Sequence, residues 1–365
     1  MRGLLAFTLI ILSSLLSGCG DEEKQQTKTQ TAEQKHYNWK LVTSWPKNFP
    51  GLGLAPVRFS EMVDEMSAGR LKIHVYGAGE LVPSFGVFDA VSEGAVQMGH
   101  SAAYYWKGKA PAAQFFATIP FGLNAQQMNG WLNYGGGQKL WDEVYAPFNI
   151  IPLPGGNTGT QMGGWFNKEI NSIADLQGLK MRIPGLGGEV LKKVGGVPVT
   201  LPGKELFTAL QTGTIDASEW VGPYNDLAFG FNKVAKYYYY PGWHEPGPTM
   251  EFLLNKPAFE GLPKDLQAIV KVAAQAINQD MLDEYTAKNI AALDALINEH
   301  NVQLRPFPQD VINALKKAAK EVMAEQSAKN PQMKKIYAQY QKYQQGVNQY
   351  HQVSENAYNR MVDNQ

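Results

Sequence analysis

The alternation of short apolar strands with amphipathic helical stretches is the feature that most constrains this fold. Stretch 56–69 places apolar residues on one helical face and precedes the alternating strand pattern of 71–77. Further strands are expected at 39–45, 94–101, 148–154, 178–184 and 198–202, with a helical stretch over 125–146. Such alternation predicts an α/β fold with parallel sheets, in which ligands bind where loops leave the carboxyl ends of the strands.

Two long helical stretches close the chain. The first spans 263–299 and the second follows Pro331 to about residue 361, both with apolar residues at steps of three and four. The second outruns the usual globular helix, so its apolar stripe needs a partner. Two interpretations are open at this point: the helix packs across the two domains of its own chain, or it lies against a second subunit.

Residues 1–19 predict a lipoprotein signal peptide. Arg2 precedes an apolar run that is too short to span a bilayer comfortably, and Leu16-Ser17-Gly18-Cys19 is similar to a bacterial lipobox. The alternative is an ordinary cleaved signal with a chance cysteine. Residues 20–36 are polar and predict a flexible tether. Cys19 is the only cysteine, which excludes disulfides, zinc–cysteine sites and a cysteine nucleophile from the body.

The charge balance argues against a nucleic-acid partner. Lysine plus arginine number 33 and aspartate plus glutamate also number 33, so no net field attracts polyanions. The rest of the chain has no apolar run long enough to cross a membrane. We therefore expect a soluble extracytoplasmic body whose lipid anchor is its sole membrane contact.

Enzyme signatures are scarce in this sequence. It contains no GxSxG elbow, no phosphate-binding GxxxxGK[ST], no HExxH, and no GxGxxG after a strand. The six histidines are scattered, and His244 alone adjoins a suggestive carboxylate, Glu245. Without a nucleophile–base pair, the sequence predicts a protein that is not an enzyme.

Several polar residues stand among aromatic and glycine residues. Gln161 lies in the glycine-rich stretch 158–167, and Arg182 lies between two apolar residues at a strand end. Arg182 is either a surface arginine or an anion-binding group, and the second interpretation fits its apolar neighbours better. Glu219, beside Trp220, and Glu245 are each, taken alone, ordinary solvated loop acids.

Four motifs together resemble the solute-binding proteins of tripartite ATP-independent periplasmic (TRAP) transporters, of the DctP type. The resemblance extends from Trp39 to the C-terminal helices and is strongest to the subgroup that binds 2-oxo acids such as pyruvate, or 2-hydroxy acids such as lactate, with a metal ion. The motifs are GTQMGGWFNKEI (159–170), LKMRIPGLGGEVLKKVGG (179–196), DASEWVGPYND (216–226) and YYYYPGWHEPG (237–247).

The resemblance implies a two-lobed periplasmic-binding-protein fold of type II, with hinge strands and an interlobe cleft. The implied boundaries are 37–152 plus 217–252 for the first lobe and 153–216 plus 253–310 for the second. Residues 311–365 would form C-terminal helices that make a homodimer.

The resemblance also implies roles for individual residues. Arg182 would clasp the ligand carboxylate, and the metal ligands would be Gln161, Glu219, the Trp220 carbonyl and Glu245. The remaining ligand contacts would come from Asn225, Tyr104 and Tyr105. His244 departs from the bulky aromatic that similar proteins often carry, so the pocket wall is expected to differ there.

The metal ligands are hard oxygen donors, which suit Ca²⁺, Mg²⁺ or Na⁺. Two glutamates and a ligand carboxylate carry three negative charges against one positive charge on Arg182. Calcium makes that sum neutral, so calcium is favoured and sodium stays an alternative.

The expected function is therefore a TRAP receptor that delivers a small 2-oxo or 2-hydroxy carboxylate to membrane subunits. Rival hypotheses are a receptor for a sugar acid, sugar alcohol or aromatic acid, and a periplasmic metal-dependent hydrolase or lyase that uses Glu245 and His244.

Overall fold

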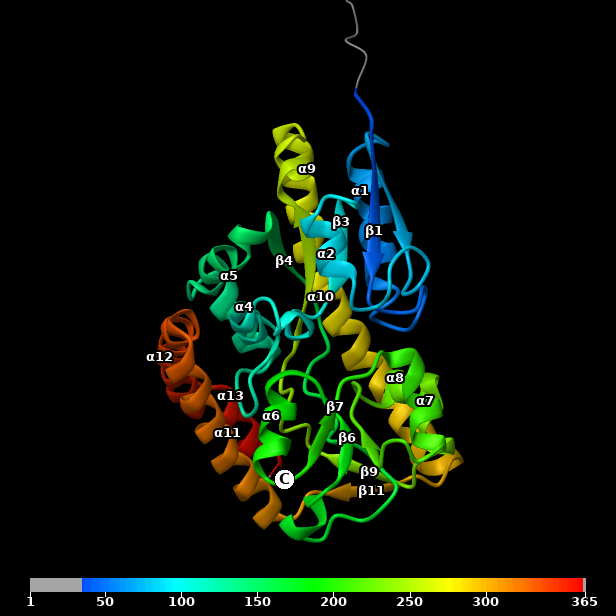
Figure 1. The fold of residues 1–365 in the computed structure, drawn as a ribbon, viewed down its shortest axis with the longest axis vertical. Coiled ribbons are helices and arrows are strands. Elements are labelled where there is room, and N and C mark those ends of the chain that lie inside the picture. The colour runs from blue at the N-terminus through cyan, green and yellow to red at the C-terminus, as the bar shows by residue number, and fades with distance from the viewer. Residues whose placement is uncertain (1–34, 364–365) are drawn as a thin grey trace, which may run out of the picture. The chain divides into compact units, whose positions relative to one another are not determined.

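Two β-sheets with flanking helices organise residues 35–363, which are the residues that the computed structural model describes (Figure 1). From His36 onward these residues belong to one unit. The predicted signal peptide, the lipidation site Cys19 and nearly all of the tether lie outside the described residues. Within the described part of the chain, no helix is both long enough and apolar enough to cross a membrane.

The first sheet has the strand order β2-β1-β3-β10-β4. β1 runs parallel to β2 and β3, whereas β10 runs antiparallel to β3 and β4. The expectation of a parallel sheet is therefore wrong for β10, because this strand runs opposite to both of its neighbours, β3 and β4. The strands are β1 (Tyr37–Thr43), β2 (Leu71–Tyr76), β3 (Met98–Ser101), β4 (Ile150–Asn157) and β10 (Thr249–Asn255).

The second sheet has the strand order β11-β9-β5-β8-β6-β7. β6 is parallel to β7 and β8, and β5 is antiparallel to β8 and β9. These strands are β5 (Gly164–Phe166), β6 (Lys180–Arg182), β7 (Val197–Val199), β8 (Ala217–Ser218), β9 (Tyr237–Tyr240) and β11 (Gln303–Pro306). The two sheets confirm the predicted two-lobed α/β architecture.

The strand pairing differs from the lobe boundaries expected from the sequence. Range 217–252 was expected with the first lobe, but β8 and β9 within it pair in the second sheet. The reason is local: Ser218 pairs with both Arg182 and Trp165, so backbone hydrogen bonds hold β8 between β6 and β5. The chain passes to the second sheet after β4, returns after β9, and passes back along α10 (Lys264–Asp294).

The helices mostly follow the predicted stretches. The stretch 125–146 is divided into α4 and α5, because Gly136 adopts a left-handed φ of 87° between them. Helix α10 continues through a π-helical turn to Glu299, as the length of stretch 263–299 predicts. The other helices up to this point are α1 (Ala55–Met66), α2 (Val87–Ser92), α3 (Gln114–Ala117), α4 (Ala125–Asn133), α5 (Gly137–Tyr145), α6 (Gly185–Lys193), α7 (Gly203–Gln211), α8 (Pro223–Phe229) and α9 (Lys256–Glu260).

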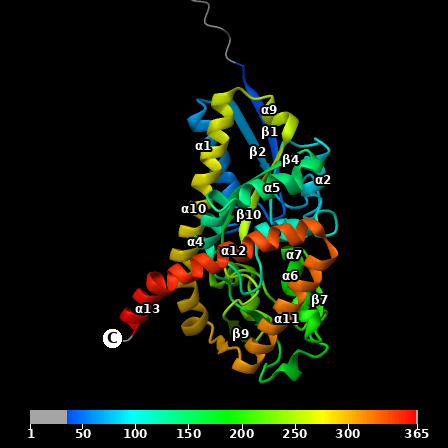
Figure 2. The ribbon, with the colours of Figure 1, turned by 90° about the vertical axis from the view of Figure 1, so that its left-hand side faces the viewer.

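Three helices end the chain: α11 (Gln309–Lys329), α12 (Pro331–Val353) and α13 (Glu355–Asp363). Helix α11 packs on α6, and α12 packs on α4 and α5 (Figure 2). The buried face of α12 includes Met333, Ile336 and Tyr340, whose hydroxyl accepts a hydrogen bond from the Leu123 N–H at 2.7 Å. Most of the predicted stripe therefore packs within its own chain. Helix α13, by contrast, has no buried residue.

Candidate ligand and metal site

Arg182 ends β6 and exposes only 1% of its side chain, so the surface-arginine interpretation is wrong. Its Nε donates to the Leu201 carbonyl at 3.2 Å and its Nη2 donates to the Tyr105 hydroxyl at 3.0 Å. Its Nη1 donates to the Glu219 carboxylate, and its guanidinium carbon lies 5.0 Å from the centroid of the Trp220 ring. A buried guanidinium is tolerated when its donors are paired in this way.

Glu219 directly follows β8, the parallel neighbour of β6. Because Ser218 stands opposite Arg182 in the sheet, the next residue projects at the same carboxyl edge. The Glu219 side chain is 1% exposed and forms an ion pair with Arg182. Glu245 is 2% exposed. The interpretation of these two acids as solvated loop residues is therefore wrong for both.

Gln161 and Glu245 are brought together by contacts between two loops. The Gln161 N–H donates to the Glu245 carbonyl at 3.1 Å, and the Gly242 N–H donates to the Gln161 carbonyl at 2.8 Å. A Cβ on residue 242 would lie 2.3 Å from that carbonyl oxygen, so only glycine permits this approach. The loops thus place the Gln161 and Glu245 segments side by side.

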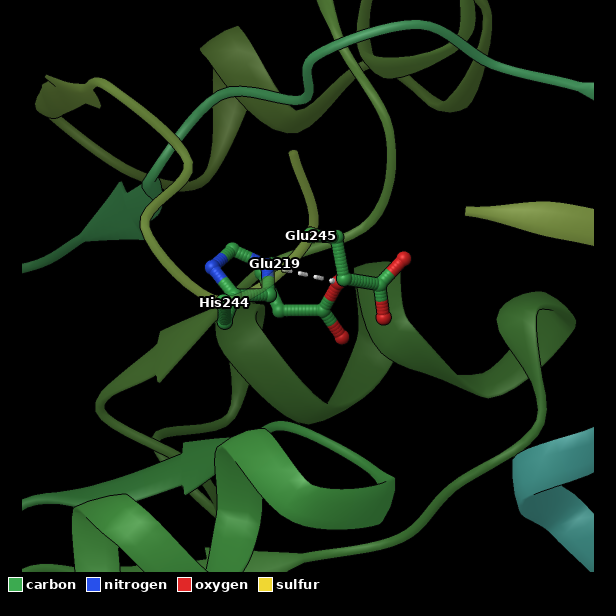
Figure 3. A group of neighbouring side chains, drawn as sticks. All are labelled: Glu219, His244 and Glu245. Carbon is green, nitrogen blue, oxygen red and sulfur yellow. Dashed lines mark ion pairs between the residues drawn. The ribbon is translucent and has the colours of Figure 1, made fainter. Parts of the chain in front are cut away.

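Several buried polar atoms of these loops lack partners among the described residues. They are Gln161 Oε1, Glu245 Oε2 and both ring nitrogens of His244. One ligand atom each of Glu219, His244 and Glu245 lies within 4.8 Å of the others. Figure 3 shows these side chains and the contact of 3.4 Å between His244 Nε2 and Glu219 Oε2, which is an ion pair only when the imidazole is protonated. Unpartnered buried oxygens beside carboxylates fit a bound cation, since each unmade hydrogen bond is costly.

The pKa shifts of the buried charged groups also favour a bound cation. Burial raises the pKa of Glu245 well above its usual range, and the neighbouring Glu219 charge raises it further, although Arg182 opposes this rise. Burial by itself lowers the pKa of Arg182, but Glu219, Tyr105, Tyr104 and Glu245 together outweigh that effect and the pKa is raised. The site therefore keeps its arginine charged and has more carboxylates than one arginine can neutralise.

A small cavity of about 10 Å³, close to the space that one water molecule needs, lies beside Gln161 and Trp220, whereas Arg182, Glu219 and Glu245 are not part of its wall. The wall includes the predicted residues Tyr104, Tyr105, Gln161 and Trp220. It also includes residues that the sequence reasoning missed: Trp45, Leu52, Thr158, Val221 and Met250. Trp45 follows β1 after one intervening residue, Ser44, and that position near a strand's carboxyl end is the signal that could have found it.

Hydrogen bonds through His100 of β3 hold the orientation of the Trp45 side chain. The indole N–H donates to His100 Nδ1 at 2.9 Å, and His100 Nε2 donates to the Gly155 carbonyl at 2.9 Å. Burial lowers the pKa of His100 to about 4, so the ring is neutral and its Nδ1 remains an acceptor at neutral pH. This chain of hydrogen bonds holds the orientation of one cavity wall.

Asn225, expected as a ligand contact, is not part of the cavity wall. Its Nδ2 donates to the Pro50 carbonyl at 2.9 Å, and its Oδ1 accepts from the Tyr285 hydroxyl at 2.8 Å. Both ends of the amide are thus engaged. Asn225 joins the loop after β1 to α8 and α10, which is a structural role.

Asp226, one residue further on, supports the segment that carries Glu219 and Trp220. Its carboxylate accepts from the Val221 N–H at 3.3 Å, the Trp165 indole N–H at 3.0 Å and the Tyr238 hydroxyl at 2.7 Å. Burial raises the pKa of Asp226 to about 7 against the opposing effect of these donors. The sequence reasoning gave this residue no role.

Comparison with known proteins agrees with this geometry. Residues 41–330 match the DctP family, bacterial extracellular solute-binding protein, family 7. This chain belongs to that family. It is 44% identical, over 91% of its length and 92% of the relative's, to a monocarboxylate 2-oxoacid-binding periplasmic protein of Nostoc sp. (strain PCC 7120).

Solved structures of TRAP periplasmic solute-binding proteins are similar to this DctP-family chain throughout. One from Pseudoalteromonas atlantica T6c, with bound sodium and pyruvate, is 47% identical with a TM-score of 0.87, covering 89% of this chain and 99% of that one. Another from Bordetella bronchiseptica RB50, a dimer with copurified calcium and picolinate, is 41% identical with a TM-score of 0.88, covering 90% and 97%. The DctP family consists of solute-binding receptors, in agreement with the expected class of protein.

Proposed function

We propose that this DctP-family protein is the receptor of a TRAP transporter for a small 2-oxo or 2-hydroxy monocarboxylate, which it binds together with a metal ion. The observation that carries this proposal is the buried Arg182–Glu219 pair beside the unpartnered oxygens of Gln161 and Glu245. A guanidinium recognises a carboxylate through paired hydrogen bonds, and the oxygens fit a cation.

Each group has a separate task in this proposal. Arg182 binds the ligand carboxylate with its Nη atoms, while Tyr105 and Trp220 keep the guanidinium in place. Gln161, Glu219, the Trp220 carbonyl and Glu245 would hold the cation, which when bound neutralises the carboxylates and attracts the ligand's 2-oxo or 2-hydroxy oxygen. Tyr104 closes the cavity wall.

The ligands of the two relatives share one chemical property that favours this class. Pyruvate and picolinate each carry a carboxylate next to a second donor atom, a ketone oxygen in one and a ring nitrogen in the other. Both can therefore chelate one ion. The cavity volume of about 10 Å³ lies far below the ~300 to 1,000 Å³ typical of pockets for drug-sized ligands, so the lobes would have to part before a ligand enters. The 2-oxoacid-binding relative favours a small chelating acid over a sugar acid or sugar alcohol, and the picolinate complex keeps an aromatic acid as the second candidate.

The charge balance favours calcium over sodium. Two glutamates and the ligand carboxylate against Arg182 leave two negative charges, which a divalent ion neutralises in a poorly solvated site. Relatives have been crystallised with sodium and with calcium, so sodium stays the alternative.

We further propose that the protein is anchored through Cys19 outside the cytoplasm and passes its ligand to TRAP membrane subunits. The lobes that carry the two sheets would close on the ligand by a hinge motion where the chain crosses between them. A homodimer would cover the end of the chain, where Tyr350, Val353, Tyr358 and Met361 are 62 to 79% exposed. The Bordetella relative is a dimer, which supports this assembly.

Calorimetry on protein stripped of divalent ions and kept in potassium buffer would test the ligand and the ion. Pyruvate, lactate and picolinate should bind when Ca²⁺ or Na⁺ is supplied. Propionate, which lacks the second donor atom, should bind at least about tenfold more weakly, a loss of ~1.4 kcal/mol. Stabilisation by a sugar acid or sugar alcohol, with no binding of the three chelating acids, would overturn the proposal.

A further inference from the structure

His244 is a buried imidazole that the proposed carboxylate and metal site does not yet use. Its side chain is 1% exposed, and neither ring nitrogen has a hydrogen-bond partner among the described residues. Its Nε2 faces Glu219 Oε2 at 3.4 Å (Figure 3). Trp243 packs beside the ring at a centroid distance of 5.4 Å. The next residue along the chain is Glu245, whose Oε2 is also unpartnered.

A buried imidazole loses stabilising free energy when neither ring nitrogen has a hydrogen-bond partner. An unsatisfied buried polar group costs about 1–3 kcal/mol, and an apolar ring of similar size would avoid this loss. One carboxylate oxygen, Glu219 Oε2, lies 3.4 Å from Nε2, and Glu219, His244 and Glu245 form a group whose ligand atoms can meet at one ion. A metal ion placed there would pair with the His244 nitrogen and both carboxylates at once.

We propose that His244 supplies a nitrogen ligand to this metal site, an inference that rests on the proposed metal-dependent function. The nitrogen would extend the range of ions that the site binds to first-row divalent transition ions such as Co²⁺, Mn²⁺ and Zn²⁺. Imidazole binds these ions far better than it binds Ca²⁺ or Na⁺, which prefer oxygen. A neutral imidazole adds no charge, so a divalent ion still balances the two glutamates and the ligand against Arg182.

A competing role is that His244 only orients Glu219 through a hydrogen bond from Nε2. The two roles differ in what they predict for different ions. An orienting hydrogen bond would affect the affinity for every ion that Glu219 binds, whereas a nitrogen ligand affects transition ions selectively.

The test compares wild type, His244→Gln and His74→Gln after removal of bound metal. His74 is an exposed histidine on β2 and serves as the control for a lost imidazole. Calorimetry with Co²⁺, Zn²⁺ and Ca²⁺, each with pyruvate present, gives the ion affinities, and the d–d absorption of bound Co²⁺ reports its ligands. Calcium-dependent stabilisation by pyruvate shows that each variant keeps a folded site.

We expect His244→Gln to lower the Co²⁺ and Zn²⁺ affinities by at least about tenfold, with less than about a threefold change for Ca²⁺. The Co²⁺ absorption should change in His244→Gln and not in His74→Gln. Equal losses for all three ions, or a wild type that binds Ca²⁺ and no transition ion, would overturn this inference and leave the proposed function standing. Tight binding of pyruvate without any ion would overturn the metal part of both.

Discussion

Arg182 and Glu219 form an ion pair in which each side chain exposes only 1% of its surface. The pair joins the ends of two neighbouring parallel strands, β6 and β8, at the edge where the cavity lies. Burying both charges costs desolvation energy that their attraction only partly returns. Such a buried ion pair therefore contributes little net free energy to folding, which agrees with a role for Arg182 in binding an anionic ligand.

Replacing Arg182 alone should remove both stability and ligand binding. Arg182→Met leaves Glu219 buried without its partner, which costs about 3–5 kcal/mol of unfolding free energy. The double variant Arg182→Met/Glu219→Gln carries no unpaired charge and should recover most of that loss. Urea unfolding measures the stability, and thermal stabilisation by pyruvate measures binding.

The double variant separates folding from recognition. It should stay unresponsive to pyruvate even though it is folded, because no guanidinium remains to pair with the carboxylate. A double variant that binds pyruvate as tightly as wild type would show that Arg182 is not the carboxylate-binding group.

Glu219→Gln should weaken the dependence of binding on a cation. The amide keeps an oxygen that can accept from Arg182, but it removes one of the negative charges that a cation balances. We expect the calcium affinity measured with pyruvate present to fall by about 10–100-fold. An unchanged calcium titration would place the ion elsewhere. Glu189→Gln, a partly exposed acid on α6, is the control.

Gly242→Ala should disturb the site without touching any proposed ligand. The added methyl group would lie 2.3 Å from the Gln161 carbonyl oxygen, a contact that forces the two loops apart. We expect pyruvate and calcium to bind at least about tenfold more weakly because Gln161 and Glu245 separate. Gly108→Ala, where a Cβ has no neighbour within 4 Å, should bind both as wild type does. Equal affinities for the two variants would contradict this account of the loops.

Glu251 should make stability depend on pH. This buried carboxyl of β10 accepts from the Trp106 indole at 2.6 Å and the Tyr145 hydroxyl at 2.8 Å, and burial raises its pKa from 4.5 to about 7 against these bonds. Between those pH values the folded protein keeps a proton that the unfolded chain has released. The contribution of Glu251 to the unfolding free energy therefore falls as the pH rises through this window, by up to about 3 kcal/mol.

Glu251→Gln cannot ionise, so its unfolding free energy relative to wild type should increase from pH 4.5 to pH 7 and then level off. Urea unfolding across this range measures the difference. Other buried groups such as His100 and Asp226 are common to both proteins and cancel in the comparison. A difference that is constant with pH, as expected for the exposed control Glu61→Gln, would contradict the assignment.

The sequence indicated the main candidate site residues because the patterns that mark them extend over only a few neighbouring residues. Arg182 was predicted at a strand end and lies there, and the glycines around Gln161 and before Glu245 were recognisable in the chain itself. The contacts of Asn225 with Pro50 and Tyr285 could not be predicted, since these partners lie far away in the sequence, and its role at the ligand stays a prediction. Thr158 and Met250 were missed because no local pattern shows that their distant segments share one cavity with Trp45, whose place after a strand was the one available signal.

The sequence by itself determined the α/β class, the positions of most strands and helices, and the family to which the chain belongs. Alternation and helical spacing express backbone and burial preferences over a few residues, so they can be recognised without a structure. Only the tertiary structure decided that Glu219 and Glu245 are buried and that β8 lies in the second sheet. It also decided that His244 faces Glu219. Burial and pairing depend on which distant segments pack together, and a carboxylate flanked by the same neighbours can be solvated or enclosed.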